Sequence, residues 1–316
     1  MKPVIRTYTP EMRHHWDAFV RQSFNGTFLH LRDYMDYHAG RFDDFSLLLY
    51  DENTLTGLLP AHREGDTLYS HNGLTFGGWI NRRNYRLEYM RQMWDALLLF
   101  LKRNGIKQLI LKEIPLFFPP YLSERNRTVF RFSGRVIFEA PFWIIDTRRP
   151  LDGLLNHDRK RSIARAQNLD VRPTEKWAVF WEILEQNLAR RHQARPVHSL
   201  DEIRLLASRF PERIRLFGAF DGDEMFAGTV VYLYRHVLHF QYTSARPEPA
   251  YRSAVDKLVW EVLRSHYRRY AYISLGTALD GKEHAWSLAY WKYSFGAEPV
   301  AQYFWQFNVL ETEPSI

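Results

Sequence analysis

One lysine stands inside an apolar pattern near the end of the chain. In the stretch LAYWKYSFGAE, residues 288–298, the side chains of Leu288, Trp291, Lys292 and Phe295 have the spacing of a single helical face. A cation fixed in a low-dielectric cleft can stabilise negative charge on a reacting oxygen. The alternative is a lysine whose stem packs against the protein while its ammonium reaches solvent. The position makes Lys292 a candidate functional residue.

Further candidates lie at the ends of two predicted strands. Tyr242 ends the run VLHFQYTSA, where its phenol could act as a general acid toward a leaving thiolate or ester oxygen, although a tyrosine packed in the core is the alternative. Ser70, His71 and Asn72 end the corresponding strand of the first half and could bind an acceptor, with His71 as a base near neutral pH. The Asn-Gly pair at 72–73 is equally an ordinary turn signal.

Two basic segments could bind an anion. In HDRKRSIARAQ, residues 157–167, Arg161 and Arg165 are four positions apart and share one helical face. Guanidinium groups suit phosphate or carboxylate, so a donor phosphate or an acidic acceptor could dock there; a solvated charged face is the alternative. Arg191 and His192 end another predicted helix, where the imidazole could bind substrate or only cap the helix.

Several kinds of site are excluded or not expected. The chain has no cysteine, which rules out disulfides, thiolate metal sites and a cysteine nucleophile. His236 and His239 should point to opposite faces of a strand and therefore cannot hold one metal together. Since H-E-x-x-H, G-x-S-x-G and Walker motifs are also absent, the sequence predicts neither a metal site nor a serine-hydrolase triad.

Composition points to a globular protein with a basic surface. The 316 residues are 46% hydrophobic and 16% aromatic, enough to fill two domain cores. Lys and Arg number 43 against 36 acidic residues, a net charge of +7 that suits a nucleic acid, a nucleotide cofactor or an anionic headgroup, or simply keeps the protein soluble. No secretory h-region or membrane-length apolar run is present, so a soluble cytoplasmic protein is expected.

The element pattern repeats. Strand-like runs from 46 to 72 precede a predicted helix at 85–103 and a strand at 108–114; strands from 214 to 245 likewise precede a helix at 251–269 and a strand at 272–277. In this repeat, Gly57 corresponds to Gly228, and the residue pair at 69–70 corresponds to the pair at 242–243. This order predicts a tandem duplication, with domains at 1–149 and 150–316 and an α/β (α+β) fold of helices on mostly antiparallel sheets.

Three sequence features together resemble the FemAB-like branch of the GNAT acyltransferase superfamily. They are the basic helix with Arg161, Ile163, Arg165 and Ala166, the later RH-x-x-x-P of residues 191–196, and the L-x-x-x-K-x-x-F-G-A of residues 288–297. The resemblance covers nearly the whole chain, including SHNGLTFGGW at 70–79, which looks like bacterial proteins of this branch. It implies tandem GNAT domains, each with a twisted sheet that contains a splayed strand pair.

The resemblance also implies a place for the donor. In the superfamily, the pyrophosphate of acyl-CoA is held by backbone N–H groups before the helix that follows the fourth strand; here that segment reads TSARPEPAYRSA. The candidate contacts in it are Thr243, Ser244, Arg246 and Arg252. The segment has no glycine, and Pro247 and Pro249 remove two amide donors. Acyl-CoA and aminoacyl-tRNA therefore remain alternative co-substrates, with no tightly bound cofactor expected.

The function implied by the resemblance is transfer of an acyl or aminoacyl group to an amine by direct attack. Lys292 would hold the oxyanion, with Tyr242 and His71 in proton transfer. The acceptor would be a small molecule or a cell-envelope precursor; tRNA is a possible partner, and DNA is not expected. The proline-bearing loop at 247–249 favours the alternative, a non-catalytic binding module on a degenerate GNAT scaffold. The sequence does not indicate an oligomeric state.

Overall fold

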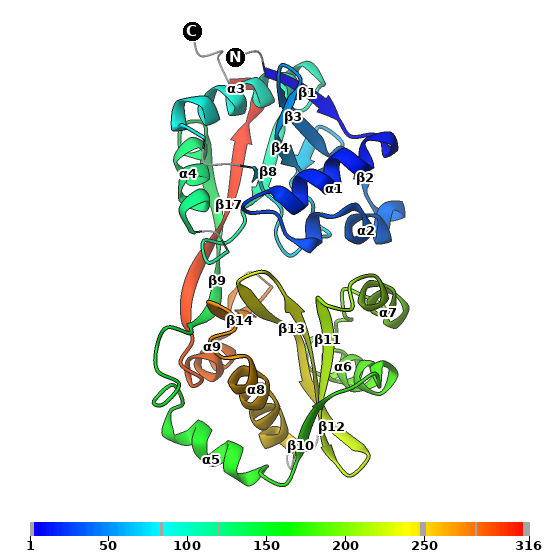
Figure 1. Ribbon diagram of the computed structural model, residues 1–316, viewed down its shortest axis with the longest axis vertical. Helices are drawn as coiled ribbons and strands as arrows, with labels where there is room; N and C mark the ends of the chain where they lie inside the picture. Colours follow the sequence, from blue (N-terminus) through cyan, green and yellow to red (C-terminus); the bar gives the residue numbers. More distant parts are fainter. Residues whose placement is uncertain (1–2, 83–84, 119, 247–250, 282, 312–316) are drawn as a thin grey trace. The chain divides into compact units, whose positions relative to one another are not determined.

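The chain folds into two compact units, seen in a computed structural model that describes residues 3–82, 85–118, 120–246, 251–281 and 283–311 (Figure 1). Unit 1 comprises Met1–Ala140 and Val300–Ile316, and unit 2 comprises Pro141–Pro299. This division differs from the expected boundary between residues 149 and 150, because residues 141–149 belong to unit 2 and residues 300–316 belong to unit 1. Strand pairing between segments far apart in sequence causes the difference.

Unit 1 begins with a strand and a group of short helices and ends with a strand from the far end of the chain. Its elements are β1 (Pro3–Thr7), η1 (Pro10–Met12), α1 (Arg13–Gln22), η2 (Phe28–His30), α2 (Arg32–Met35), η3 (Asp36–Arg41), β2 (Asp43–Asp44), β3 (Leu47–Asp51), β4 (Thr54–Leu59), β5 (His62–Glu64), β6 (Thr67–Tyr69), β7 (Ile80–Asn81), α3 (Leu87–Arg103), β8 (Gln108–Lys112), α4 (Pro120–Phe130), the first part of β9 (Gly134–Asp146), most of β17 (Glu298–Asn308), and η5 (Val309–Glu311).

Unit 2 repeats the same order with longer strands. Its elements are the end of β9, then α5 (His157–Arg165), β10 (Asp170–Pro173), α6 (Trp177–His192), α7 (Leu200–Arg209), β11 (Ile214–Asp221), β12 (Glu224–Leu233), β13 (Val237–Ala245), α8 (Arg252–His266), β14 (Tyr272–Thr277), β15 (Leu279–Asp280), β16 (Glu283–His284) and α9 (Trp286–Tyr293). The predicted succession of strands, helix and strand is confirmed in both units.

Most strand pairs are antiparallel, as predicted. In unit 2 the strands lie in the order β10-β11-β12-β13-β14-β9, with α8 on one face and α6 and α7 on the other (Figure 1). In unit 1 the strands form two sets, β1-β3-β4-β7 and β17-β8-β6-β5-β2. Parallel pairing occurs between β13 and β14 and, at the corresponding place in unit 1, between β6 and β8. In both units the long helix, α8 or α3, connects the two parallel strands.

The two long helices build the cores. Met93, Trp94, Leu97 and other residues of α3 lie fully inside unit 1, and the matching stripe of α8 lies inside unit 2. These are the apolar faces that the helical spacing predicts. The predicted C-terminal cap of α3 is also confirmed: Asn104 N–H donates to Phe100 O, and Gly105 adopts a φ of 74°.

A buried ion pair fastens the last strand to unit 1. Glu113 and Arg127 are 4% and 5% exposed, and Arg127 Nε lies 3.1 Å from both carboxylate oxygens of Glu113. The same carboxylate accepts from the backbone N–H of Tyr303 at 2.8 Å and from Trp305 Nε1 at 3.1 Å, both on β17. Full hydrogen bonding offsets the cost of burying these charges.

Candidate functional site

A splayed strand pair opens in unit 2. The parallel pairing of β13 with β14 begins at Val237 and Tyr272 and ends at His239 and Ser274. Strand β13 continues to Ala245 with β12 as its partner, while β14 continues to Thr277 beside β9. The strands therefore part after His239 and Ser274, which creates an opening between their carboxyl ends.

A β-bulge places two polar side chains on the same face of β13. Strand β12 pairs Tyr232 with His239 and Val230 with Tyr242, and the register shifts between them at Gln241. Since Tyr232 and Val230 are two positions apart, their partners His239 and Tyr242 lie on the same face of β13 despite being three apart. Simple alternation along the sequence would place them on opposite faces.

Lys292 reaches the end of the splayed pair from α9. Its side chain belongs to a residue only 4% exposed, and Nζ donates a hydrogen bond to the backbone oxygen of Thr277. Burial lowers the pKa of Lys292 to about 7. The ammonium therefore does not extend into solvent, as the alternative interpretation of its sequence position required.

The helical face expected around Lys292 is only partly correct. Helix α9 ends at Tyr293, so Phe295 lies beyond it, and Leu288 is 38% exposed. Phe295 is nevertheless fully buried, because Gly296 turns the chain with a φ of 81°. The spacing of apolar residues identified Lys292 correctly as buried, but not the length of the helix around it.

Gly276 leaves a small space in front of the Lys292 ammonium. A Cβ atom placed on Gly276 would lie 3.6 Å from His239 Cε1, 3.8 Å from Lys292 Nζ and 3.8 Å from the backbone oxygen of Phe240. Its φ of 74° is one that glycine adopts readily. An imidazole, an ammonium and a backbone carbonyl thus surround a position where the chain has no side chain.

His239 is held in its neutral form beside this space. Its Nδ1 lies 3.0 Å from Ser274 Oγ, and the Gly276 N–H donates to the same hydroxyl at 3.3 Å. Burial, together with the positive charge of Lys292, lowers the pKa of His239 to about 3. At neutral pH the positive charge of this cluster therefore resides on Lys292.

Tyr242 contacts the α6 and α7 side of the sheet. Its hydroxyl lies 2.6 Å from His198 Nδ1, and its ring packs edge-on against Trp181 at 5.4 Å. Burial raises the pKa of Tyr242 to about 12, so the phenol stays protonated at neutral pH. It keeps a proton available for a strongly basic leaving group.

The described donor-loop candidates are engaged within the protein. Thr243 Oγ1 lies 2.8 Å from Thr229 Oγ1, and Ser244 Oγ accepts from Asn187 Nδ2 at 2.8 Å. Arg246 pairs with Glu224, and its backbone N–H donates to Phe226 O at 2.9 Å. Pro247, Pro249 and the side chain of Arg252 lie outside the described residues.

The arginines expected on the basic helix face solvent. Arg161 is exposed and pairs with Asp158 on the same helix at 2.7 Å, and Arg165 is also exposed. The least exposed arginine of α5 is Arg159, whose side chain is 12% exposed and pairs with Asp256 on α8. The side chains of Arg191 and His192, at the end of α6, lie outside the described residues.

The Arg159–Asp256 pair supports the helix that carries Lys292. Asp256 accepts from Trp291 Nε1 at 2.8 Å, and Arg159 Nε donates to Ser294 Oγ at 2.9 Å. Trp291 and Ser294 are close to Lys292 in sequence, so these hydrogen bonds hold α9 against α5 and α8. A helix interpreted from its sequence as an anion site therefore also has a positioning role.

In unit 1, His71 lies in a cluster of imidazoles. His71 is 3% exposed, stacks on His38 at 5.1 Å and meets His62 edge-on at 5.4 Å. Burial and the charges of His38 and His62 lower the pKa of His71 to about 2. Its imidazole is therefore a very weak base, which corrects the expectation of a base near neutral pH.

The rest of the segment SHNG closes the splay of unit 1. The Ser70 backbone N–H donates to Ile110 O at 2.9 Å, and Ser70 Oγ accepts from the Lys112 N–H at 2.8 Å. Farther on, the Gly77 N–H donates to Lys112 O at 3.2 Å. The Asn72 N–H donates to His62 Nδ1 at 3.4 Å. Residues 70–79 thus cover the strand end where unit 2 is open.

The registers show that this covering segment is an insertion. The last parallel pair is Tyr69 with Ile110 in unit 1 and His239 with Ser274 in unit 2. Leu58 follows Gly57 as Thr229 follows Gly228, and these two residues pair with Ile80 on β7 and with Thr243 on β13. Residues 70–79 therefore stand where unit 2 has only 240–242, and Tyr69 corresponds to His239, not to Tyr242 as the sequence comparison suggested.

Sequence reasoning missed three residues of the unit 2 site. They are His239, Gly276 and His198. The signal for Gly276 was present, since a glycine inside the strand YISLGT marks a place where another group approaches closely. His239 was assigned to the wrong face because a bulge has no clear sequence signature. His198 lies in a loop that is far in sequence from its partner Tyr242.

Two further properties of the described residues bear on the site. No described helix has both the length and the apolar character needed to cross a bilayer. Within the same part of the chain, no group of three or more His, Asp or Glu side chains could hold a metal ion, and the cluster of His38, His62 and His71 is no exception.

Comparison with known proteins agrees with this geometry. Residues 157–292 match a family model described as "Acetyltransferase (GNAT) domain", a range that starts at α5 and ends at Lys292. No curated protein sequence matches the chain.

The whole chain is similar in fold to several solved structures. The crystal structure of FemX has a TM-score of 0.68 at 9% identity, with 96% of this chain and 97% of that chain covered. The C-terminal domain of a lysylphosphatidylglycerol synthetase from Agrobacterium fabrum has a TM-score of 0.59 at 13% identity, with 94% of this chain and 92% of that chain covered. A tandem GNAT protein from the clavulanic acid biosynthesis pathway has a TM-score of 0.52 at 12% identity, with 100% of both chains covered.

These similarities and the splayed strand pair of unit 2 identify the fold that the sequence predicts. The family model accounts for unit 2, and the tandem-domain structures account for the repeated strand order of both units. Residues 157–292 therefore carry a GNAT acetyltransferase domain, and the chain as a whole shares its fold with FemX and with a tandem GNAT protein.

Proposed function

We propose that unit 2 transfers an acyl or aminoacyl group from an activated donor to an amine, with the reacting carbonyl seated in the space beside Gly276. The observation that carries this proposal is the position of the Lys292 ammonium, 3.8 Å from where a Gly276 Cβ would lie. That cation, poorly solvated and fixed by Thr277, is suited to a developing oxyanion.

The proposed reaction is a direct transfer. The amine nitrogen attacks the donor carbonyl, a C–N bond forms, and the bond from the carbonyl carbon to the leaving sulfur or oxygen breaks. Lys292 holds the negative charge that develops on the carbonyl oxygen between these events. Tyr242, which its raised pKa of about 12 keeps protonated, donates its phenol proton to the leaving group, and the proton lost by the amine restores the phenol, so that one proton passes overall from the amine to the leaving group.

Unit 2, not unit 1, is proposed to hold the donor. The splay of unit 2 is lined by His239, Ser274 and Gly276, whereas in unit 1 the corresponding strand end is covered by the chain's own residues 70–79. In a GNAT fold the splay admits the activated acyl group, so a covered splay has no room for it. The acceptor amine is proposed to be a small molecule or a cell-envelope precursor.

The donor is the first property to test. Calorimetric titration with acetyl-CoA, followed by a longer acyl-CoA, should give saturable binding at about micromolar strength, near −8 kcal/mol, if acyl-CoA is the donor. If neither gives heat, filter binding to aminoacyl-tRNA at increasing salt tests the other donor, with affinity falling steeply because phosphate contacts release counterions. Binding of neither donor would contradict the proposal.

Catalysis is tested separately from binding. With the donor that binds, product formation is followed over a panel of amines for the wild type and for Lys292→Met, with Lys112→Met as the matched control in unit 1. A loss confined to the Lys292 variant supports the assignment. Equal rates for all three proteins would remove Lys292 from the mechanism.

A further inference from the structure

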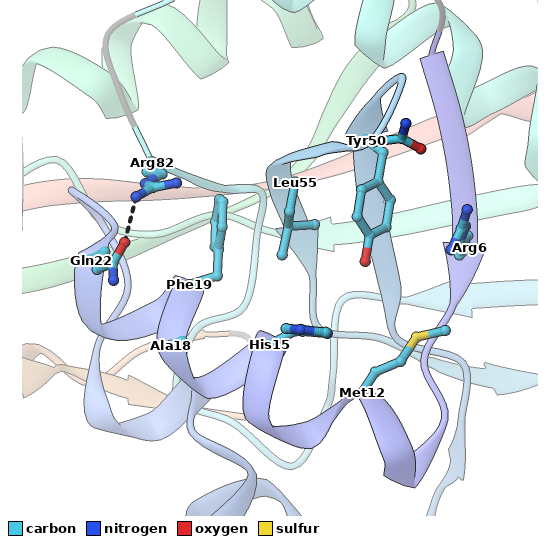
Figure 2. Close-up of a pocket in the computed structure, with 10 residues that line it drawn as sticks. Arg6, Met12, His15, Ala18, Phe19, Gln22, Tyr50, Leu55 and Arg82 are labelled. Carbon is cyan, nitrogen blue, oxygen red and sulfur yellow. Dashed lines mark hydrogen bonds between the residues drawn. The ribbon is translucent and has the colours of Figure 1, made fainter.

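A separate pocket opens on unit 1, between α1 and the β1-β3-β4 strands (Figure 2). Its volume is about 500 Å³, within the size range of small-molecule sites. The lining residues are Arg6, Met12, His15, Ala18, Phe19, Gln22, Tyr50, Asn53, Leu55 and Arg82. None of them belongs to the histidine cluster or to the covering segment at 70–79.

The strand register explains why an apolar base forms here. Tyr50 pairs with Leu55 on β4 and with Val4 on β1, so the side chains of these residues share one face of the strands. Arg6, two positions after Val4, lies on the same face. Helix α1 presents Phe19 toward that face, and the rings of Phe19 and Tyr50 flank Leu55 (Figure 2).

The ends of the pocket are cationic. Arg82 lies at one end, where its Nη2 donates to Gln22 Oε1 at 2.5 Å, and Arg6 lies at the other, with its guanidinium 5.1 Å from the Tyr50 ring centre (Figure 2). None of the described lining residues carries a carboxylate. Neither guanidinium forms an ion pair with any residue that the structure describes. No described acidic side chain therefore neutralises the positive charge of Arg6 and Arg82 at this pocket.

We propose that this pocket binds an organic anion with an apolar, ring-containing body. The anionic group, a carboxylate or a phosphate, pairs with Arg82, whose guanidinium also donates to Gln22. The apolar body lies along Phe19, Leu55 and Tyr50, where it replaces water over an apolar base. Arg6 adds attraction from the other end. An apolar hollow alone would accept neutral molecules equally well; the two unpaired guanidinium groups make the site selective for anions.

This inference does not depend on the transfer reaction. Its test uses no acyl donor and no amine, so its failure leaves the proposed function of unit 2 untouched. The probe is 8-anilinonaphthalene-1-sulfonate, an aromatic anion whose fluorescence rises in apolar surroundings. Its matched neutral counterpart is N-phenyl-1-naphthylamine, which has the same rings without the sulfonate.

Fluorescence titration of the full-length chain should show the anionic probe binding at least tenfold more tightly than the neutral one. Arg82→Gln should weaken binding of the anionic probe at least tenfold and Arg6→Gln about threefold, while binding of the neutral probe stays within twofold. Arg103→Gln, at an exposed arginine on α3 outside the pocket, should change neither. Circular dichroism confirms that each variant is folded.

Competition identifies the natural head group. Displacement of the probe by naphthoate but not by naphthyl phosphate assigns a carboxylate ligand, and the reverse assigns a phosphate; either result supports the proposal. Equal binding of the two probes, or unchanged binding in both arginine variants, would overturn it, because the cations would then contribute nothing to recognition.

Discussion

Each unit places a lysine ammonium in poorly solvated surroundings at the end of a parallel strand pair, but the two lysines face different neighbours. In unit 2, Nζ of Lys292 faces the space left by Gly276. In unit 1, Nζ of Lys112 donates to the backbone oxygen of Leu74 at 2.6 Å, within the segment that covers the strand end. Burial lowers both pKa values, to about 7 and about 8. A poorly solvated lysine ammonium is thus common to both units, but in unit 1 it is bonded by the covering segment, whereas in unit 2 it faces the space beside Gly276.

The registers make this contrast sharper. Lys112 follows Ile110 by two positions, as Gly276 follows Ser274, and Ile110 and Ser274 occupy the same place in the two parallel pairs. The position that carries a lysine in unit 1 therefore carries a glycine in unit 2, and the ammonium of unit 2 comes from another helix. After duplication, a scaffold of this kind can keep one open splay and use its copy for support or for another ligand.

The largest effect should come from removing the two ammonium groups one at a time. Lys292→Met should lower turnover by about 10²- to 10³-fold, the loss typical of one oxyanion contact, while Lys112→Met should change it less than about threefold. Steady-state rates with the donor that binds provide the measurement. Comparable losses in both variants would mean that the units share the chemistry.

Filling the space beside Lys292 should have the next largest effect. Gly276→Ala puts a methyl group 3.8 Å from Nζ and should reduce turnover at least tenfold. Its φ is positive, so backbone strain should also cost about 1 kcal/mol of stability. The control is Gly222→Ala, which has a φ of 56° and nothing within 4 Å of the new methyl group. A similar loss of turnover in the control would show that strain, not occupied space, is responsible.

The pH dependence of turnover should reveal which form of Lys292 acts. If the ammonium holds the oxyanion, the rate should fall toward tenfold per pH unit as pH rises above about 7, because the positive charge is then lost. The acceptor amine also ionises in this pH range, so the rates should be compared at equal concentrations of the neutral amine. A rate that rises through the same pH range would instead assign Lys292 as the proton acceptor.

The smallest effect concerns the histidine cluster of unit 1. His71 has its pKa lowered to about 2, so the folded protein binds fewer protons than the unfolded chain below the ordinary histidine pKa of about 6.5. Its contribution to stability is complete above that pH and is lost as pH falls, at up to about 1.4 kcal/mol per pH unit.

Urea unfolding between pH 7 and pH 5 measures this slope. His71→Asn, which tolerates the φ of 66°, should reduce the slope by about one proton. The matched variant in unit 2 is His239→Asn. The pKa of His239 is lowered to about 3, so this substitution should reduce the slope similarly. An unchanged slope in either variant would mean that the corresponding imidazole stays solvated enough to titrate normally.

The sequence was sufficient to predict the fold class and the two long helices. The stripes of α3 and α8 repeat at the helical period, and the strands that flank them carry clear turns, so the duplicated order could be recognised without coordinates. Lys292 was identified because a lysine inside an apolar pattern is conspicuous. Such features depend on neighbours along the chain.

The parts that the sequence did not reveal depend on contacts between distant segments. The bulge at Gln241 rotates Tyr242 onto the face of His239, and alternation along the strand cannot show this. The partner of Tyr242, His198, and the route of β17 into unit 1 are set by tertiary packing. The pKa of His71 was likewise misjudged, because its low value results from burial among other imidazoles.

The contribution of β17 to unit 1 sets an order of events during synthesis. The carboxylate of Glu113 has its Arg127 partner as soon as α4 has formed, but its contacts with Tyr303 and Trp305 require residues that are synthesised after unit 2. Unit 2 lies entirely between these segments and can fold first. The sheet of unit 1 therefore stays incomplete until β17 has been synthesised, and we expect unit 1 to need protection from aggregation for that interval.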